Sequence, residues 1–346
     1  MFQRVIWSVL LLLAGVVFSP ADASAEKLKV VTTSADYAYV VGYIGGDFVT
    51  VSNIIQGNQD PHQVRPKPSF AQLLAEADIL VATGLDLEMW LPSLIDKSGN
   101  SRIREGQRGY VAVHYGVDKL EIPTSYDRSA GDVHVFGNPH FHTNPLTMKL
   151  VARNIAIGLI KNDSAHESFY KAQVRKFQDE IDERMFGKEL VALIGSKTLT
   201  KLARKGNLIS FLEKKKFKGK LLIEHLGGWM KKALPLRGVK LVSFHKNWTY
   251  FAQVFGLDFV GEVEPKPGIP PSAQDVANLV DLMNRDQVKV IFAANYFDEN
   301  KIRRICQKVS ASAVVVPLSV SGEPGVNTYF DLVDLWLNRL LEATGK

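Results

Sequence analysis

The sequence predicts an α/β protein of two lobes, each with a mainly parallel sheet flanked by helices, joined by a long rigid backbone helix. Short runs rich in Val, Ile and Thr alternate with helical patterns, which favours parallel sheets. This alternation occurs twice, on either side of one long helical pattern. The length of 346 residues exceeds what one ordinary core holds and suits two domains of about 150 residues each.

The first lobe is expected to cover residues 26–160. Four runs in it have the composition of strands, and three segments between them have the periodicity of helices. The expected strands are 28–33, 48–55, 78–83 and 109–114, and the expected helices are 34–44, 69–77 and 86–97.

A linking helix is expected within residues 161–187. From Ser164 to Phe186 apolar residues recur at helical spacing, and Gly187 is suited to end the helix. At about 1.5 Å per residue this segment would span about 34 Å, the length of a domain. The apolar stripe consists of Phe169, Val174, Phe177, Ile181 and Met185.

The second lobe is expected to cover residues 188–346, and it repeats the alternating order of strands and helices. Its first part, residues 188–235, is interpreted as a basic, helical elaboration that also contains Gly227-Gly228-Trp229. The expected strands are 239–243, 257–263, 288–293 and 313–317, and the expected helices are 247–255, 272–285, 298–309 and 327–343.

Residues 1–25 have the features of a cleaved signal peptide. Arg4 precedes a mostly apolar run from Val5 to Phe18, and Ala23-Ser24-Ala25 is a small-residue cleavage site before Glu26. The apolar run is shorter than the roughly 20 residues of a membrane span, although an uncleaved anchor is the alternative. No cysteine follows the cleavage point to carry a lipid, so the mature chain is expected to be a soluble periplasmic protein.

The composition narrows the possible metal chemistry and the possible partners. Cys306 is the only cysteine, which excludes an internal disulfide framework and a cysteine-rich metal site. The net charge of +6 arises in one segment, since residues 201–220 contain eight basic residues and one acidic residue, a local charge of +7. A solvated surface explains this run better than a docking surface for an acidic partner, and no nucleic acid is expected as a ligand.

Three histidines lie in loops that precede helices. His62 is in Asp60-Pro-His, His140 is in Asn138-Pro-His, and His245 follows the strand expected at 239–243. Ligands of open α/β folds collect beyond the carboxyl ends of strands, so these loops can meet at one point. Imidazole is a favoured ligand of zinc and neighbouring divalent metals. The alternative is that these are loop histidines that bind backbone groups.

Two neighbours of His140 are expected to support the loop, namely His134 and Asp132. His142 would point to the other side of an extended segment, which favours a packing role or a role in supporting a ligand.

The ordered set of motifs resembles the zinc/manganese-type solute-binding proteins of ABC transporters. The resemblance implies two lobes linked by a rigid helix, a metal in the cleft held by His62, His140 and His245, and an inner-membrane permease as partner. It also implies a monomer that catalyses no reaction. The motifs are Val30–Thr33, Ile44–Val49, Asp60-Pro-His62 with Pro68-Ser69, Ala77–Leu80, Gly84–Trp90, Asn138-Pro-His140, His245, Val288–Phe292 and Thr328-Tyr329.

The sequence departs from this family at two positions. Asn138 replaces an aspartate, and Ser319 stands where an aspartate often closes the site. The fourth ligand is therefore open between water, Glu323 and His142. Three neutral imidazoles without an identified carboxylate favour zinc over manganese.

Two other functional classes remain as alternatives. Three histidines and a water are also the metal ligands of hydrolytic zinc enzymes, although no HExxH motif is present. The second alternative is a surface interaction protein that uses the basic segment 201–220.

Overall fold

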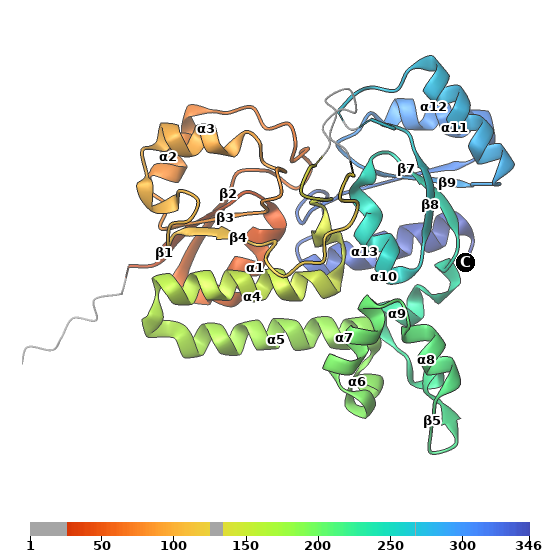
Figure 1. Cartoon of the computed structure of the whole chain (residues 1–346), viewed down its shortest axis with the longest axis horizontal. Helices are drawn as coiled ribbons and strands as arrows, with labels where there is room; N and C mark the ends of the chain where they lie inside the picture. Colours follow the sequence, from red (N-terminus) through yellow and green to blue (C-terminus); the bar gives the residue numbers. More distant parts are fainter. Residues whose placement is uncertain (1–25, 125–133, 267) are drawn as a thin grey trace, which may run out of the picture.

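The computed structural model describes residues 26–124, 134–266 and 268–346. It contains a four-stranded parallel sheet in each half of the chain, flanked by helices (Figure 1). The predicted α/β fold with two parallel sheets is thus confirmed. The expected signal peptide and Asp132 lie outside the described residues. No helix in the described ranges is both long enough and apolar enough to cross a membrane.

The first sheet has the strand order β2-β1-β3-β4. Its central strands are apolar on both faces, as expected for strands covered by helices on both sides. The strands are β1 (Leu28–Thr32), β2 (Val49–Asn53), β3 (Ile79–Ala82) and β4 (Tyr110–Ala112), and the helices are α1 (Ala35–Gly45), α2 (Pro68–Ala75) and α3 (Leu91–Ser98).

Helix α3 begins five residues later than expected, at Leu91 instead of residue 86. Gly84, Leu85 and Asp86 have φ angles of 78°, 57° and 59°. A right-handed helix requires negative φ, so it cannot start before this turn ends.

The second sheet has the order β10-β9-β7-β8. If the strands of each sheet are numbered from one, both sheets have the order 2-1-3-4. In both, the chain moves to one side of the first strand to form the second and then to the other side to form the third. Such a reversal marks where ligands bind in open α/β sheets. The strands are β7 (Lys240–Ser243), β8 (Asp258–Glu262), β9 (Val290–Ala294) and β10 (Ser312–Val316), and the helices are α10 (Thr249–Phe255), α11 (Ala273–Arg285), α12 (Glu299–Val309) and α13 (Tyr329–Thr344).

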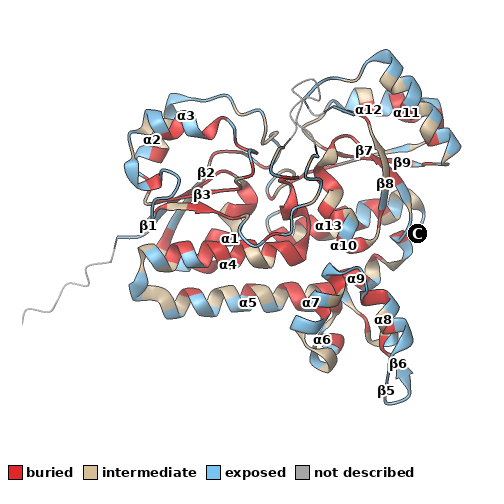
Figure 2. Ribbon diagram, in the orientation of Figure 1, coloured by how far each residue is buried: buried red, intermediate tan, exposed pale blue. Residues whose placement is uncertain are grey.

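Two long helices, α4 (Pro145–Asn162) and α5 (Glu167–Phe186), run side by side beneath the first sheet (Figure 1). The long helix expected from Ser164 is present as α5 after a 3-10 turn at Ser164–His166. Phe177, Ile181 and Met185 of its stripe are fully buried. They belong to one continuous apolar core that joins α1, α4 and α5 to α10 and α13, and Figure 2 shows the buried residues along α4 and α13. The division of the chain at residues 161 and 188 stays a prediction.

The segment 188–235 is helical only in part. It contains α6 (Lys188–Ile194), α7 (Ser196–Arg204), α8 (Leu208–Lys214) and α9 (Gly228–Lys232). The lysine run, expected to be a solvated surface within this helical elaboration, forms a hairpin of β5 (Lys216–Phe217) and β6 (Lys220–Leu221). The two connecting residues, Lys218 and Gly219, have φ angles of 47° and 87°, as in the two-residue turns whose twist suits a hairpin.

Glycines allow α9 to start against the end of α5. A Cβ atom on Gly187 would lie 2.7 Å from the Cα atom of Gly227, and one on Gly228 would lie 2.0 Å from the Arg184 carbonyl oxygen. This close approach places Trp229 of α9 in the core, where its indole N–H donates to Asp334 at 2.9 Å.

Gly187 and Gly195 provide a matched test of this packing. Their backbone angles are nearly equal, with φ/ψ of 83°/144° and 85°/141°, but a Cβ atom on Gly195 would meet nothing within 4 Å. We expect Gly195→Ala to lower the free energy of unfolding by about 1–3 kcal/mol through backbone strain alone. Gly187→Ala should cost about 1–3 kcal/mol more through steric overlap. Urea unfolding measures both, and equal losses would contradict the packing argument.

Candidate metal centre

The three predicted histidines meet at one point. His62 comes from the loop between β2 and α2, His140 precedes the 3-10 turn Phe141–Thr143 that leads into α4, and His245 follows β7. One side-chain nitrogen of each lies within 4.8 Å of the others, and the ring centroids are 5.1, 5.2 and 5.5 Å apart. His140 and His245 are buried, and His62 is partly buried.

An oxygen atom next to Nδ1 orients each of the three rings. Nδ1 of His62 lies 2.8 Å from Asp60 Oδ1, and Nδ1 of His140 lies 2.9 Å from Asn138 Oδ1. Nδ1 of His245 lies 3.5 Å from Glu264 Oε2. Because these oxygens accept hydrogen bonds, the ring proton is on Nδ1 and the lone pair is on Nε2. Such an arrangement is typical of histidines that bind a metal through Nε2.

Burial favours the uncharged form of His140 and His245. It lowers the pKa of His140 well below its usual value, and the neighbouring rings of His62 and His245 lower it further. Burial also lowers the pKa of His245, although the hydrogen bond to Glu264 acts in the opposite direction. Neutral imidazole is the form that binds metal ions, so the lowered pKa values favour the metal-binding form of His140 and His245.

The Nε2 atom of His140 is buried and has no hydrogen-bond partner among the described residues. A buried acceptor without a partner costs about 1–3 kcal/mol. A cation among the three rings would satisfy this atom together with Nε2 of His62 and His245, so the donor set fits a divalent metal ion.

Asn138 connects the His140 loop to the second lobe. Its Oδ1 accepts from the backbone N–H of His140 at 2.9 Å as well as from the ring. Its Nδ2 donates to Glu121 Oε2 at 2.7 Å, to the Lys246 carbonyl at 2.8 Å and to Thr249 Oγ1 at 3.2 Å. An aspartate has no hydrogen to donate, which explains in physical terms why an amide stands here.

Glu323 and His142, the two side chains considered as a fourth ligand, do not join the three converging histidines. Glu323 Oε1 is 3.5 Å from the guanidinium of Arg339 on α13. The buried ring of His142 has Nε2 4.0 Å from the Asp36 carboxylate, in agreement with its expected packing role. Neither residue belongs to the group of converging nitrogens.

His134 is closer to the site than the sequence indicated. Its Nε2 lies 3.1 Å from Nε2 of His62, and its ring centroid lies 6.0 Å from that of His140. Burial, together with the rings of His62 and His245, lowers the pKa of His134 to about 3. The sequence indicated only that His134 lies in the same loop as His140. This position alone could not show whether His134 binds the metal or supports a residue that does.

A small cavity of about 230 Å³ adjoins the site. It is lined by Asp60, His62, His245 and Glu264, by Pro270 and Phe297, and by other residues up to the start of α12. Its size suits an ion better than a large organic substrate, which needs about 300–1,000 Å³.

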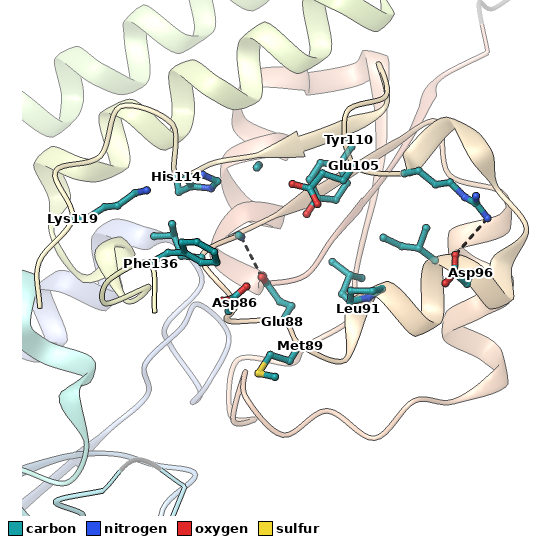
Figure 3. Close-up of a pocket in the computed structure, with 16 residues that line it drawn as sticks. Asp86, Glu88, Met89, Leu91, Asp96, Glu105, Tyr110, His114, Lys119 and Phe136 are labelled. Carbon is teal, nitrogen blue, oxygen red and sulfur yellow. Dashed lines mark hydrogen bonds and ion pairs between the residues drawn. The ribbon is translucent and has the colours of Figure 1, made fainter. Parts of the chain in front are cut away.

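A larger cavity of about 550 Å³ lies at the carboxyl ends of β3 and β4 and contains Asp86, Glu88, Glu105 and His114 (Figure 3). The oxygens of Glu88 already accept from the Thr33 hydroxyl at 2.6 Å and from the backbone N–H groups of Thr83 and Gly84 at 2.8 and 3.2 Å. Glu88 is therefore not a free ligand, and the only converging group of potential ligands among the described residues is that of His62, His140 and His245.

Comparison with known proteins identifies the family. Residues 30–185 and 215–343 match the profile described as "Zinc-uptake complex component A periplasmic". The chain belongs to this family. It is thus a metal-binding, substrate-binding component of an ABC transporter, as the motifs indicated, and the family is not one of enzymes. The unmatched stretch, residues 186–214, contains α6, α7 and α8.

Individual relatives are distant but cover nearly the whole chain. The manganese ABC transporter substrate-binding lipoprotein PsaA of Streptococcus mitis is 22% identical and covers 98% of this chain and 96% of its own length. The crystal structure of ZnuA superposes with a TM-score of 0.66 at 20% identity, covering 92% of this chain and 99% of that one. The Mn-bound periplasmic metal binding protein of Candidatus Liberibacter asiaticus gives 0.64 at 16% identity, covering 91% and 99%.

The hydrogen bonds of Asn138 can be tested without metal. Asn138→Asp should lower the free energy of unfolding of the metal-free protein by about 1–3 kcal/mol, because buried acceptors would then face the Glu121 carboxylate and the Lys246 carbonyl. Asn144→Asp is the matched control in the same loop, since Asn144 caps α4 through its Oδ1 atom and aspartate caps a helix equally well. Urea unfolding at pH 7 measures both. Equal stability of Asn138→Asp and the unchanged protein would show that the amide donors are dispensable.

Proposed function

We propose that the protein captures a zinc ion through Nε2 of His62, His140 and His245 and delivers it to the permease of an ABC transporter. The convergence of these three ring nitrogens carries the proposal. Support comes from the partnerless Nε2 of His140, which a bound cation would satisfy. With residues 1–25 as a cleaved signal peptide, the protein works as a monomer in the periplasm.

The preference for zinc follows from the atoms that face the centre. The streptococcal relatives are named for manganese, whereas one matching crystal structure is a ZnuA variant with zinc bound. In this chain the nearby carboxylates of Asp60 and Glu264 face Nδ1 atoms. Ser319 supplies no carboxylate. Nitrogen-rich, four-coordinate sites suit zinc, whereas manganese favours oxygen ligands.

A zinc hydrolase fits the same site less well. Such an enzyme needs a free general base and room for a substrate beside the metal. Asp60 and Glu264 both hold histidine rings, and the adjoining cavity is only about 230 Å³. The family supports transport, and nothing in the comparisons supports a surface interaction protein as the primary function.

We assign the fourth coordination position to His134. Ligand nitrogens of a tetrahedral zinc site are about 3.3 Å apart, given Zn–N distances of about 2.0–2.1 Å. The 3.1 Å between Nε2 of His134 and Nε2 of His62 is close to this spacing. To complete a tetrahedral site, the His134 ring has to move closer to His140 and His245. Its lowered pKa keeps the ring neutral, which is the form that binds a metal ion.

Metal preference is tested by competition against a chelator. Zinc should bind one to one and at least about 100-fold more tightly than manganese. His62→Ala, His140→Ala and His245→Ala should each weaken zinc binding by at least about 100-fold, because even residues that only support ligands contribute 10–100-fold. Circular dichroism checks that each variant is folded. Manganese selectivity would indicate a carboxylate ligand, and unchanged zinc affinity would remove that histidine from the site.

The fourth ligand is tested by comparing His134→Ala with Glu323→Gln. The first change should weaken zinc binding by about 10–100-fold, and the second should leave it unchanged because Glu323 pairs with Arg339. Cobalt-substituted protein gives a second readout, since replacing a nitrogen ligand by water shifts its visible absorption bands. If His134→Ala retains the affinity and the spectrum, water occupies this position.

A further inference from the structure

One strongly charged feature lies outside the metal centre. The basic hairpin, residues 214–220, contains lysines at 214, 215, 216, 218 and 220, with Phe217 and Gly219 between them. All seven residues are exposed to solvent. The hairpin therefore carries five positive charges on seven consecutive residues.

These charges have no local counter-ions. Among the described residues, no carboxylate lies within ion-pair distance of any of the five lysines, although many other surface lysines and arginines are paired. The net charge of the chain is +6 and that of residues 201–220 is +7, so the rest of the chain, with a net charge of −1, offsets little of the positive charge of this region. The sequence alone left this run as a solvated surface, and the structure shows that it is presented on a projecting element.

The hairpin also exposes an aromatic ring. Phe217 is 39% exposed and pairs with Lys220 across the two strands. The ammonium group of Lys218 lies 5.4 Å from the centre of its ring. The tight turn at Lys218 and Gly219 fixes the lysines and the ring at the tip of one element.

The position of the hairpin separates it from the metal centre. It projects away from both sheets, on the side opposite α2, α3, α11 and α12 (Figure 1), and it is exposed throughout (Figure 2). The cavity next to His62 and His245 extends to Asp298 and Lys301 at the start of α12. A partner on the hairpin would therefore leave the metal centre open.

We propose that the basic hairpin binds the surface of an anionic lipid membrane. Clusters of lysines are attracted to anionic lipid headgroups, and an aromatic side chain among them can enter the interface. The hairpin carries lysines without arginine, so it offers point charges on flexible side chains and not the fixed, bidentate geometry that recognises one particular carboxylate partner. A diffuse negative surface is the complement of such a group.

This contact would hold the protein at the membrane with its metal centre directed away from the lipid. Metal capture could then continue in the bound state. The inference is independent of the proposed metal specificity, because no residue of the hairpin belongs to the metal centre.

Vesicle sedimentation tests the proposal with the full mature chain. The probes are vesicles of phosphatidylcholine alone and vesicles with 30% phosphatidylglycerol, at about 50 and 500 mM salt. The protein should sediment only with the anionic vesicles and should be released at high salt, where exposed charges are screened. Replacing Lys215, Lys216 and Lys218 by Gln should lower the partition coefficient by about 100-fold. Phe217→Ala should lower it by about 10-fold through lost apolar contact.

A charge-matched control separates the hairpin from net charge. Lys161, Lys289 and Lys308 are exposed and lie far from the hairpin in sequence, and changing all three to Gln removes the same charge. This variant should bind vesicles like the unchanged protein, and all variants should keep their zinc affinity. Failure of the unchanged protein to bind anionic vesicles, as expected if an acidic protein were the partner, would overturn the proposal. So would an equal loss of binding in the control variant.

Discussion

The spacing between the buried imidazole rings of His140 and His245 depends on the Asn138 side chain. This amide orients His140 through Oδ1 and donates through Nδ2 to the Lys246 carbonyl and Thr249, directly beside His245. A second link is Tyr250, whose hydroxyl donates to the Asn138 carbonyl and accepts from the Leu120 N–H. Buried hydrogen bonds of this kind fix geometry because each unsatisfied group would be costly. The two histidines that come from different lobes are thereby held as one unit.

The apolar core also holds the two lobes together. One apolar cluster extends from α1, α4 and α5 to α10 and α13, and two buried hydrogen bonds cross near it. The Val320 N–H donates to Asp36, and the Tyr329 hydroxyl donates to the His142 carbonyl. Large separation of the lobes would expose this core and break these bonds. We therefore expect a metal ion to enter past His62, since His62 is the partly buried member of the three histidines.

The sequence predicted the sheets well because the strands are short apolar runs separated by helical patterns, and each appears within one or two residues of its expected place. Loop positions before helices, together with the family resemblance, led to the expectation that His62, His140 and His245 meet, and their ring nitrogens do converge, whereas their role as metal ligands stays a prediction. The sequence could not locate the start of α3, which depends on the left-handed turn at Leu85 and Asp86. Nor could it show the hairpin at Lys216–Leu221, because lysine-rich strands have no apolar pattern, or the approach of His134 to His62, which depends on tertiary folding.

The central claim is that three Nε2 atoms bind one zinc ion, and a crystal structure of the zinc-loaded protein tests it most directly. Anomalous scattering at the zinc edge would locate the ion. We predict a single ion about 2.0–2.1 Å from Nε2 of His62, His140 and His245, with Asp60, Asn138 and Glu264 still hydrogen-bonded to the Nδ1 atoms. An ion bound by the carboxylates of the Asp86 and Glu105 cavity, or one that leaves any of these three histidines unbound, would contradict it.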